Sequence, residues 1–409
     1  MLDRDQNRLI LAAVSPCRWL PATATRENTH RLPRPHAMRT GVTHPKFASD
    51  QRGRTLMPLQ QRDNNSDNAN PVSRGSMPME DIHSVQPVFE LQSPQPSAVV
   101  PLSGVTVVVY KTAEEMGRAS AIRLAREQCR LVEEQGKASF IIMAAPSAFA
   151  FYRAYVQLAE MSPQLQRACS RTHYFQFDDY PLPAHHPASF RYLLLKHFFI
   201  PLASYCDPGR VHLFDADAED TDAAARRYQE LLLTHGLDLQ IMGIGENGHW
   251  GFHEPGIPVD TPPQFMKVAL TAENVDQQMR DHPHIFTKPE DVPRSAYTCS
   301  VSMFLTTRHV IEGNVPQASK AFALLAAFGS DVVHEAVPAS ALKRFGKGVV
   351  RTTEAAAWAL LEYRNKHIVT RDALVKLAES LRGPQSSDVS AIISRICSVF
   401  DTMKISYER

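Results

Sequence analysis

The sequence Asp238-Leu-Gln-Ile-Met-Gly-Ile-Gly-Glu-Asn-Gly-His-Trp-Gly-Phe-His-Glu-Pro-Gly256 joins a short apolar run to a polar, glycine-rich loop. The apolar run, Leu239 to Met242, predicts a buried strand. Asn247, His249 and Glu254 follow it within a few residues. Because open parallel sheets bind ligands at the carboxyl ends of their strands, this loop predicts a functional site.

The glycines of the loop allow a second interpretation, a dinucleotide site. Gly243, Gly245 and Gly248 match G-x-G-x-x-G, which on its own is a weak indication of dinucleotide binding. That fingerprint opens a helix, whereas Trp250 and the Glu-Pro pair at 254–255 indicate a loop. No convincing strand ending in an acidic residue follows about 20 positions later, where a ribose contact is expected. The crowded polar groups favour a catalytic loop over both a dinucleotide site and a simple glycine-rich turn.

The pattern G-I-G-x-x-G-H-x-x-F-x-E-P-G, residues 243–256, resembles the active-site loop of the glucosamine-6-phosphate deaminase/isomerase family, which is related in fold to the 6-phosphogluconolactonases. Phe252-x-Glu254-Pro255 favours the deaminase branch. The resemblance extends over about residues 104–363. It implies an amino-sugar phosphate as the small-molecule partner, with no cofactor and no metal.

The composition divides the chain into three parts. Residues 1–98 hold eleven of the 29 prolines and little apolar periodicity, so we expect a disordered extension or a misassigned start, with Met77 or Met79 as the true beginning. Residues 99–365 alternate strand and helix patterns. They predict one α/β domain, a single doubly wound, mainly parallel sheet with helices on both faces. Residues 366–409 are expected to form a C-terminal helical tail.

The net charge and the cysteines limit the classes of partner and the compartment that the sequence predicts. A net charge of +1 provides no field that would gather nucleic acid or an anionic membrane. The six cysteines form no C-x-x-C pair, which argues against a zinc site and a disulfide framework and favours reduced thiols in the cytoplasm. The longest apolar runs are too short for a membrane span. A homo-oligomer is left open.

Two adjacent carboxylates, Asp178 and Asp179, end a second predicted strand, Tyr174 to Phe177. As an isolated pair such residues are more often found in turns or helix caps. The segment resembles the family pattern F-x-x-D-E-Y. The resemblance implies that Asp178 is the general base and that Asp179 replaces the usual glutamate.

The phosphate-binding residues are expected from the resemblance. Ser147 stands at the family's threonine position in the turn Ala144-Ala-Pro-Ser147, where the family has a loop richer in glycine. Lys320 matches a phosphate-binding lysine at a helix start, and Gly245 and Gly248 are expected to bring the loop backbone to the substrate. Met266 occupies the place of a family arginine, so Lys267 is the expected substitute.

The implied mechanism assigns one task to each group. His249 protonates the ring oxygen, Glu254 orients that histidine or shares the proton transfer, and Asp178 moves a proton between C2 and C1. Asn247 stands where the family has an aspartate, and its amide is expected to hold the imidazole through a hydrogen bond. Two alternatives stay open: a lactonase-type hydrolase, in which His249 activates water, and a non-catalytic sugar-phosphate sensor.

Overall fold

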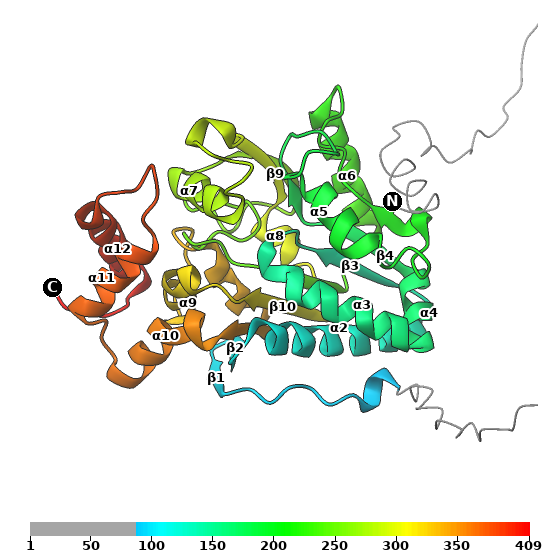
Figure 1. Ribbon diagram of the computed structural model, residues 1–409, viewed down its shortest axis with the longest axis horizontal. Helices are drawn as coiled ribbons and strands as arrows, with labels where there is room; N and C mark the ends of the chain where they lie inside the picture. Colours follow the sequence, from blue (N-terminus) through cyan, green and yellow to red (C-terminus); the bar gives the residue numbers. More distant parts are fainter. Residues whose placement is uncertain (1–86) are drawn as a thin grey trace, which may run out of the picture. The chain divides into compact units, whose positions relative to one another are not determined.

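The computed structural model describes residues 87–409 (Figure 1). Residues 1–86, most of the expected N-terminal extension, lie outside the described part of the chain. The expected extension includes residues 87–98, yet Val88 in η1 (Val88–Glu90) is fully buried. Arg126 Nε donates a hydrogen bond of 3.1 Å to the Val88 carbonyl, so this short segment packs on the domain.

An eight-stranded sheet forms the centre of the domain, and all neighbouring strands are parallel except the β1–β2 pair. Across the sheet the strands are β1 (Ala98–Leu102), β2 (Val105–Tyr110), β11 (Gly348–Thr353), β10 (Val310–Val315), β7 (Leu239–Met242), β3 (Ala138–Ile142), β4 (Thr172–Gln176) and β6 (Val211–His212). The expected mainly parallel sheet is confirmed.

The helices connect these strands in two directions. The chain first moves from β2 toward β6 through α2 (Ala113–Gln135), α3 (Phe149–Met161), α4 (Pro163–Arg171) and α5 (Phe190–Leu194). It then returns toward β11 through α6 (Thr221–His235), α7 (Ala272–Asp281), α8 (Val301–Phe304) and α9 (Ala321–Phe328), and α10 (Glu354–Lys366) follows β11. Right-handed crossovers therefore place the two groups of helices on opposite faces of the sheet.

Short helical segments complete the connections. They are η2 (Pro146–Ala148), η3 (Leu195–Phe199), η4 (Pro208–Arg210), η5 (Pro289–Asp291), η6 (Ala318–Lys320) and η7 (Pro338–Phe345). Within residues 87–409, no helix is both long and apolar enough to cross a membrane.

Local sequence signals explain the ends of α2, the longest helix in Figure 1. Thr112 and Glu115 form a capping box, in which each side chain accepts a hydrogen bond of 3.1 Å from the other residue's backbone N–H. Gly136 ends the helix in the left-handed conformation, at φ 74°. These two caps therefore set the ends of α2 at Ala113 and Gln135.

A second sheet corrects the expectation of a single one. It is antiparallel and contains β5 (Asp178–Asp179), β9 (Ser295–Cys299) and β8 (Phe265–Ala269). The strand β8 lies in the polar, proline-containing segment between Pro255 and Pro293, β9 follows that segment, and β5 is only two residues long. Such pairing between distant segments has no local periodic signal, so the sequence pattern missed it.

The C-terminal segment contains α11 (Arg371–Ser380) and α12 (Val389–Met403). The helix α12 packs on α9, where the rings of Phe400 and Phe322 lie 5.8 Å apart. It also reaches α7 through an ion pair between Arg395 and Glu273. The C-terminal segment is therefore helical, and it packs against the domain.

Candidate functional site

A pocket opens beyond the carboxyl ends of β3, β7 and β10. The connections after β3 and β7 leave toward opposite faces of the sheet, and this change of direction creates a crevice between the two neighbouring strands. The space between the lining atoms, together with the open solvent at its mouth, is about 570 Å³. Of the predicted site residues, Ser147, Asp178, Gly245, His249 and Lys320 line this pocket.

Two glycines shape the loop after β7. A Cβ atom on Gly245 would lie 2.1 Å from His249 Cε1, so only glycine leaves room for the imidazole. Gly248 has φ +88°, and a Cβ there would approach Val337 Cγ1 to 2.7 Å. The Gly245 N–H also donates a 2.9 Å hydrogen bond to the His249 carbonyl. The glycines therefore fix His249 against the loop backbone at the pocket wall.

His249 is a buried, neutral imidazole. Burial, followed by the positive charge of Lys320, lowers the pKa of His249 to about 3. Its Nδ1 atom makes no hydrogen bond within the described part of the chain and lies 4.0 Å from Glu254 Oε1. At neutral pH this histidine is able to accept a proton at one nitrogen while donating from the other.

Glu254 lies behind His249 and accepts hydrogen bonds at both oxygens. Oε2 accepts from Asn247 Nδ2 at 2.9 Å and from Thr271 Oγ1 at 3.1 Å, and Oε1 accepts from Asn274 Nδ2. Burial nevertheless raises the pKa of Glu254 to about 7, against the opposing effect of these donors. The carboxyl group therefore changes protonation state near neutral pH, as a proton-transfer residue should.

Asn247 corrects one expectation about the loop. Its amide nitrogen binds Glu254, and its Oδ1 accepts a 3.1 Å hydrogen bond from the backbone N–H of His249. It makes no hydrogen bond to the imidazole ring. The physical reason is that Glu254 and Thr271 offer acceptors for the amide, so Asn247 orients the carboxyl group and the main chain while Glu254 faces the ring.

Asp178 and Asp179 have different environments although they are adjacent. Asp178 pairs with Thr298 of β9 through the small sheet and lines the pocket. Burial, with a smaller contribution from the charge of Asp179, raises the pKa of Asp178 well above its ordinary value. A buried carboxyl group of this kind is a strong base once it ionises.

Asp179 is fully buried and serves the fold. Its oxygens accept hydrogen bonds from the backbone N–H groups of Tyr180 and Phe190, each at 2.8 Å, and from the backbone N–H of Arg191 at 3.1 Å. It thus caps the start of α5 and ties that helix to the strand end. Asp178, free of this task, remains available to the pocket.

Lys320 and Ser147 face the pocket from two helix starts. Lys320 is 3% exposed and immediately precedes α9, and within residues 87–409 no carboxylate pairs with its ammonium group. Ser147 is 7% exposed in the turn between β3 and α3, and its hydroxyl donates a hydrogen bond of 3.9 Å to Met143 Sδ. A buried lysine beside a helix N-terminus is an arrangement suited to an anion.

Lys267 does not belong to this pocket. It is an exposed residue of β8, its ammonium lies 5.8 Å from the centre of the Tyr297 ring, and neither it nor Met266 lines the pocket. The expectation that Lys267 substitutes for the family arginine is therefore corrected. The register of β8 in the small sheet, which the sequence pattern did not reveal, places the side chain elsewhere.

The helix α7 contributes pocket residues that the sequence interpretation missed. Gln277, Gln278 and Asp281 of α7 and His282 directly after it line the cavity. A signal was present: Thr271 is an N-cap whose hydroxyl accepts a 3.2 Å hydrogen bond from the Asn274 N–H. Thr271 and Asn274 also bind Glu254, so the first turn of α7 is connected directly to the candidate proton-transfer group.

Part of this chain is similar to known proteins. Residues 111–251 match the family model described as glucosamine-6-phosphate isomerases/6-phosphogluconolactonase. A glucosamine-6-phosphate deaminase from Halothermothrix orenii is 35% identical over 159 residues, 38% of this chain and 63% of that protein. One from a Geobacillus species is 29% identical over 194 residues, 46% of this chain and 72% of that protein. The chain thus spans less than two thirds of the length of the first of these relatives.

The fold has a solved counterpart. The structure of a monomeric glucosamine-6-phosphate deaminase aligns over 62% of this chain and 98% of its own length, with 26% identity and a TM-score of 0.52. The alignment covers nearly all of that protein, so it supports the arrangement of sheet and helices described above. Taken with the matched family model and the two relatives, it shows that this chain is similar to the glucosamine-6-phosphate isomerases and 6-phosphogluconolactonases.

Proposed function

We propose that this protein is an amino-sugar phosphate deaminase/isomerase, which converts glucosamine 6-phosphate or a close analogue to fructose 6-phosphate and ammonia. The observation that carries the proposal is the meeting of Asp178, His249 and Lys320 in one pocket. They come from segments after three different strands, and each has the chemistry that one part of this reaction needs. The relatives that bear the name glucosamine-6-phosphate deaminase support the same reaction.

Lys320 anchors the substrate through its phosphate. The ammonium group is buried in the pocket wall beside the start of α9, so a phosphate there would gain a direct charge contact together with helix N–H groups. Ser147, at the start of α3, offers a hydroxyl donor on the β3 side of the same pocket. This anchoring leaves the sugar ring to extend toward Asp178 and His249.

His249 and Glu254 open the ring by a proton relay. The imidazole is neutral, so it does not carry the extra proton itself. Glu254, with a pKa near 7 and an oxygen 4.0 Å from Nδ1, supplies that proton while the other ring nitrogen donates to the sugar ring oxygen. Asn247, Thr271 and Asn274 hold the glutamate in place for this transfer.

Asp178 then acts on the open-chain sugar. Its carboxylate removes the proton at C2 and returns one to C1, while the aldehyde oxygen gains a proton and the amine loses one, which converts the aminoaldose into a ketose imine. Water adds to the imine carbon, and the carbon–nitrogen bond breaks to give the ketone and ammonia. The raised pKa of Asp178 strengthens it as the base for this step.

One observation favours a second candidate, a lactonase-type hydrolase. A neutral His249 without a hydrogen bond at Nδ1 is also able to accept a proton from water, as hydrolysis of a sugar lactone requires. In that case Asp178 has no C–H proton to move. The third hypothesis, a sugar-phosphate sensor, predicts binding without turnover.

We place the activity in the cytoplasm and in amino-sugar catabolism. The five cysteines within the described residues are all free thiols, which suits a reducing compartment. A nearly balanced charge favours a small-molecule partner over nucleic acid. The oligomeric state is left open.

The experiment compares three substrates with the purified full chain. Glucosamine 6-phosphate, glucosamine and 6-phosphogluconolactone are assayed for ammonia release or lactone hydrolysis, and their binding is measured by calorimetry. The proposal predicts ammonia from glucosamine 6-phosphate, far less from glucosamine, and no faster hydrolysis of the lactone than by buffer alone. Lactone hydrolysis without ammonia release would establish the second candidate, and binding without either reaction would establish the sensor.

A further inference from the structure

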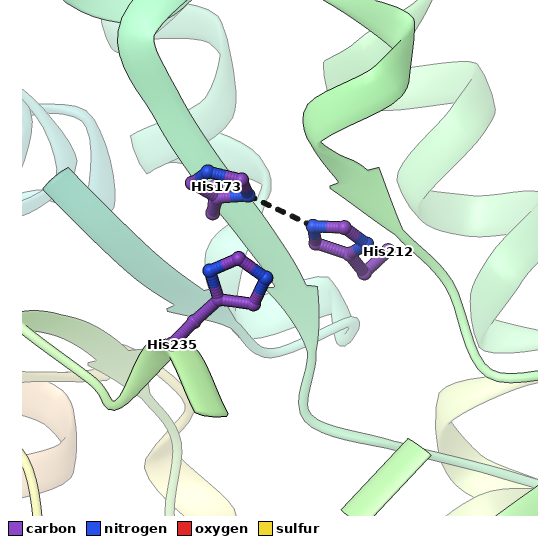
Figure 2. Close-up of side chains that lie close together, drawn as sticks. All are labelled: His173, His212 and His235. Carbon is purple, nitrogen blue, oxygen red and sulfur yellow. Dashed lines mark hydrogen bonds between the residues drawn. The ribbon is translucent and has the colours of Figure 1, made fainter. Parts of the chain in front are cut away.

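Three histidines from distant parts of the chain meet at the edge of the central sheet (Figure 2). His173 is in β4, His212 ends β6, and His235 is the last residue of α6. One nitrogen of each ring lies within 4.8 Å of the others, and His173 Nδ1 is 3.0 Å from His212 Nε2. None of the three lines the pocket.

The three histidine rings are held in place by stacking against one another and against a phenylalanine. His173 and His212 are nearly parallel, with centres 5.3 Å apart, and His173 and His235 are 4.1 Å apart. Phe175 supports the group by stacking on His212 at 4.9 Å. All three histidines are half-buried, so they are positioned by the fold and still open to solvent.

The imidazoles are neutral at physiological pH. Burial is the main cause that lowers the pKa of His173 and of His212 to about 4, and it also lowers the pKa of His235. A neutral imidazole keeps a free lone pair on one nitrogen, and that lone pair is the metal ligand.

We propose that His173, His212 and His235 form a binding site for a transition-metal ion, with Zn²⁺ as the expected ion and water at the fourth position. Imidazole suits zinc, copper and nickel, and three histidines with water are a common open zinc site. Tetrahedral ligation with Zn–N bonds of about 2.0–2.1 Å requires nitrogens roughly 3.3 Å apart. The 3.0 Å contact between His173 Nδ1 and His212 Nε2 is a hydrogen bond, which an ion would replace with loss of the shared proton, and small ring rotations would bring all three nitrogens into range. The site is independent of the proposed function.

Arg210 competes with the metal. Its Nη1 atom lies 2.7 Å from His173 Nε2 and, as a permanent donor, requires that nitrogen to be the acceptor. A metal on Nε2 would displace the guanidinium. A metal on Nδ1 would leave Nε2 protonated, and a protonated nitrogen cannot accept the hydrogen bond that Arg210 donates. In either case the hydrogen bond between Arg210 and His173 must break before the ion binds.

The released guanidinium has a partner nearby. Arg210 Nε lies 3.4 Å from Asp207 Oδ2, so the side chain can keep this ion pair while leaving His173. Lys137 is the other cation that faces the group, since its charge contributes to the lowered pKa of His173 and His235. Both cations weaken metal binding, and removal of Arg210 should therefore strengthen it.

The test measures zinc binding to the chelator-treated full chain by competition with a chromophoric chelator, with Co²⁺ as a spectroscopic probe of tetrahedral ligation. The wild type should bind one equivalent with an intense visible Co²⁺ spectrum. His212→Ala and His235→Ala should weaken binding by at least about 100-fold, more than the loss of an outer-sphere partner. Arg210→Ala should bind several-fold more tightly than the wild type.

Matched controls distinguish this site from adventitious binding by other histidines. His185 and His284 are exposed and belong to no such group, so His185→Ala and His284→Ala should bind zinc as the wild type does. Circular dichroism confirms that each variant is folded. Equal binding by His212→Ala, His235→Ala and the controls would overturn the proposal, as would a weak octahedral Co²⁺ spectrum or weaker binding by Arg210→Ala.

Discussion

Replacing Glu254 with glutamine removes an ionisable group with almost no change in volume. In the wild type this carboxyl group is 2% exposed and accepts hydrogen bonds from Asn247, Thr271 and Asn274. Glutamine keeps one acceptor oxygen but replaces the other with a donor. That mismatch costs about 1–3 kcal/mol, and the cost is the same at every pH.

The pH-dependent part of the change is set by the shifted pKa. Burial raises the pKa of Glu254 from its ordinary value of 4.5 to about 7. The folded state binds the proton on Glu254 more tightly than the unfolded state does. The contribution of this protonation to the free energy of unfolding is therefore fully present below pH 4.5 and is lost as the pH rises through 7. The shift corresponds to roughly 3 kcal/mol between the two limits.

The assay is urea denaturation of wild type and Glu254→Gln at intervals between pH 4.5 and pH 8. Other groups titrate alike in both proteins, so the difference in unfolding free energy isolates Glu254. That difference should shift by roughly 3 kcal/mol in favour of the variant as the pH rises. Two curves that stay parallel across this range would refute the assignment of a raised pKa to Glu254.

The remaining predictions concern activity on glucosamine 6-phosphate. Asp178→Asn should lower kcat by roughly 10²–10⁴ with little change in binding, and a loss of less than about threefold would make Asp178 a structural residue. Lys320→Ala should raise KM by about tenfold or more, since a charged hydrogen bond is lost, whereas the matched control Lys267→Ala should leave KM unchanged because its side chain lies outside the pocket. Asn247→Asp places a carboxylate 2.9 Å from Glu254 and should move the alkaline limb of the pH–rate profile upward by about one unit or more, so an unmoved limb would show that the two side chains do not interact.

The parts of the site that follow a strand were predictable from the sequence. Leu239 to Met242 is a strand as expected, and the polar loop after it lies at its carboxyl end. The same rule places Asp178 at the carboxyl end of its strand, whereas Lys320 is expected only from the family resemblance. Short-range periodicity and topology rules carry this information, so no knowledge of long-range packing was needed.

The parts that depend on pairing between distant segments were not predictable. The register of β8 against β9 turns Lys267 away from the pocket, and no local pattern specifies that register. Asn247 binds Glu254 rather than the His249 ring, and the other two donors to Glu254, Thr271 and Asn274, lie at the start of α7, a helix that the sequence analysis does not predict. His173, His212 and His235 are separated by dozens of residues, so their meeting appears only in the folded chain.

The measurement that tests the proposed reaction most directly follows the hydrogen at C2. Glucosamine 6-phosphate carrying deuterium at C2 is incubated with the purified protein, ammonia is quantified, and the sugar product is analysed by NMR. The account predicts that ammonia release and loss of deuterium from C2 proceed together, with the label found at C1 or in solvent, and that Asp178→Asn abolishes both. Absence of ammonia, or ammonia release with the deuterium still at C2, would contradict it.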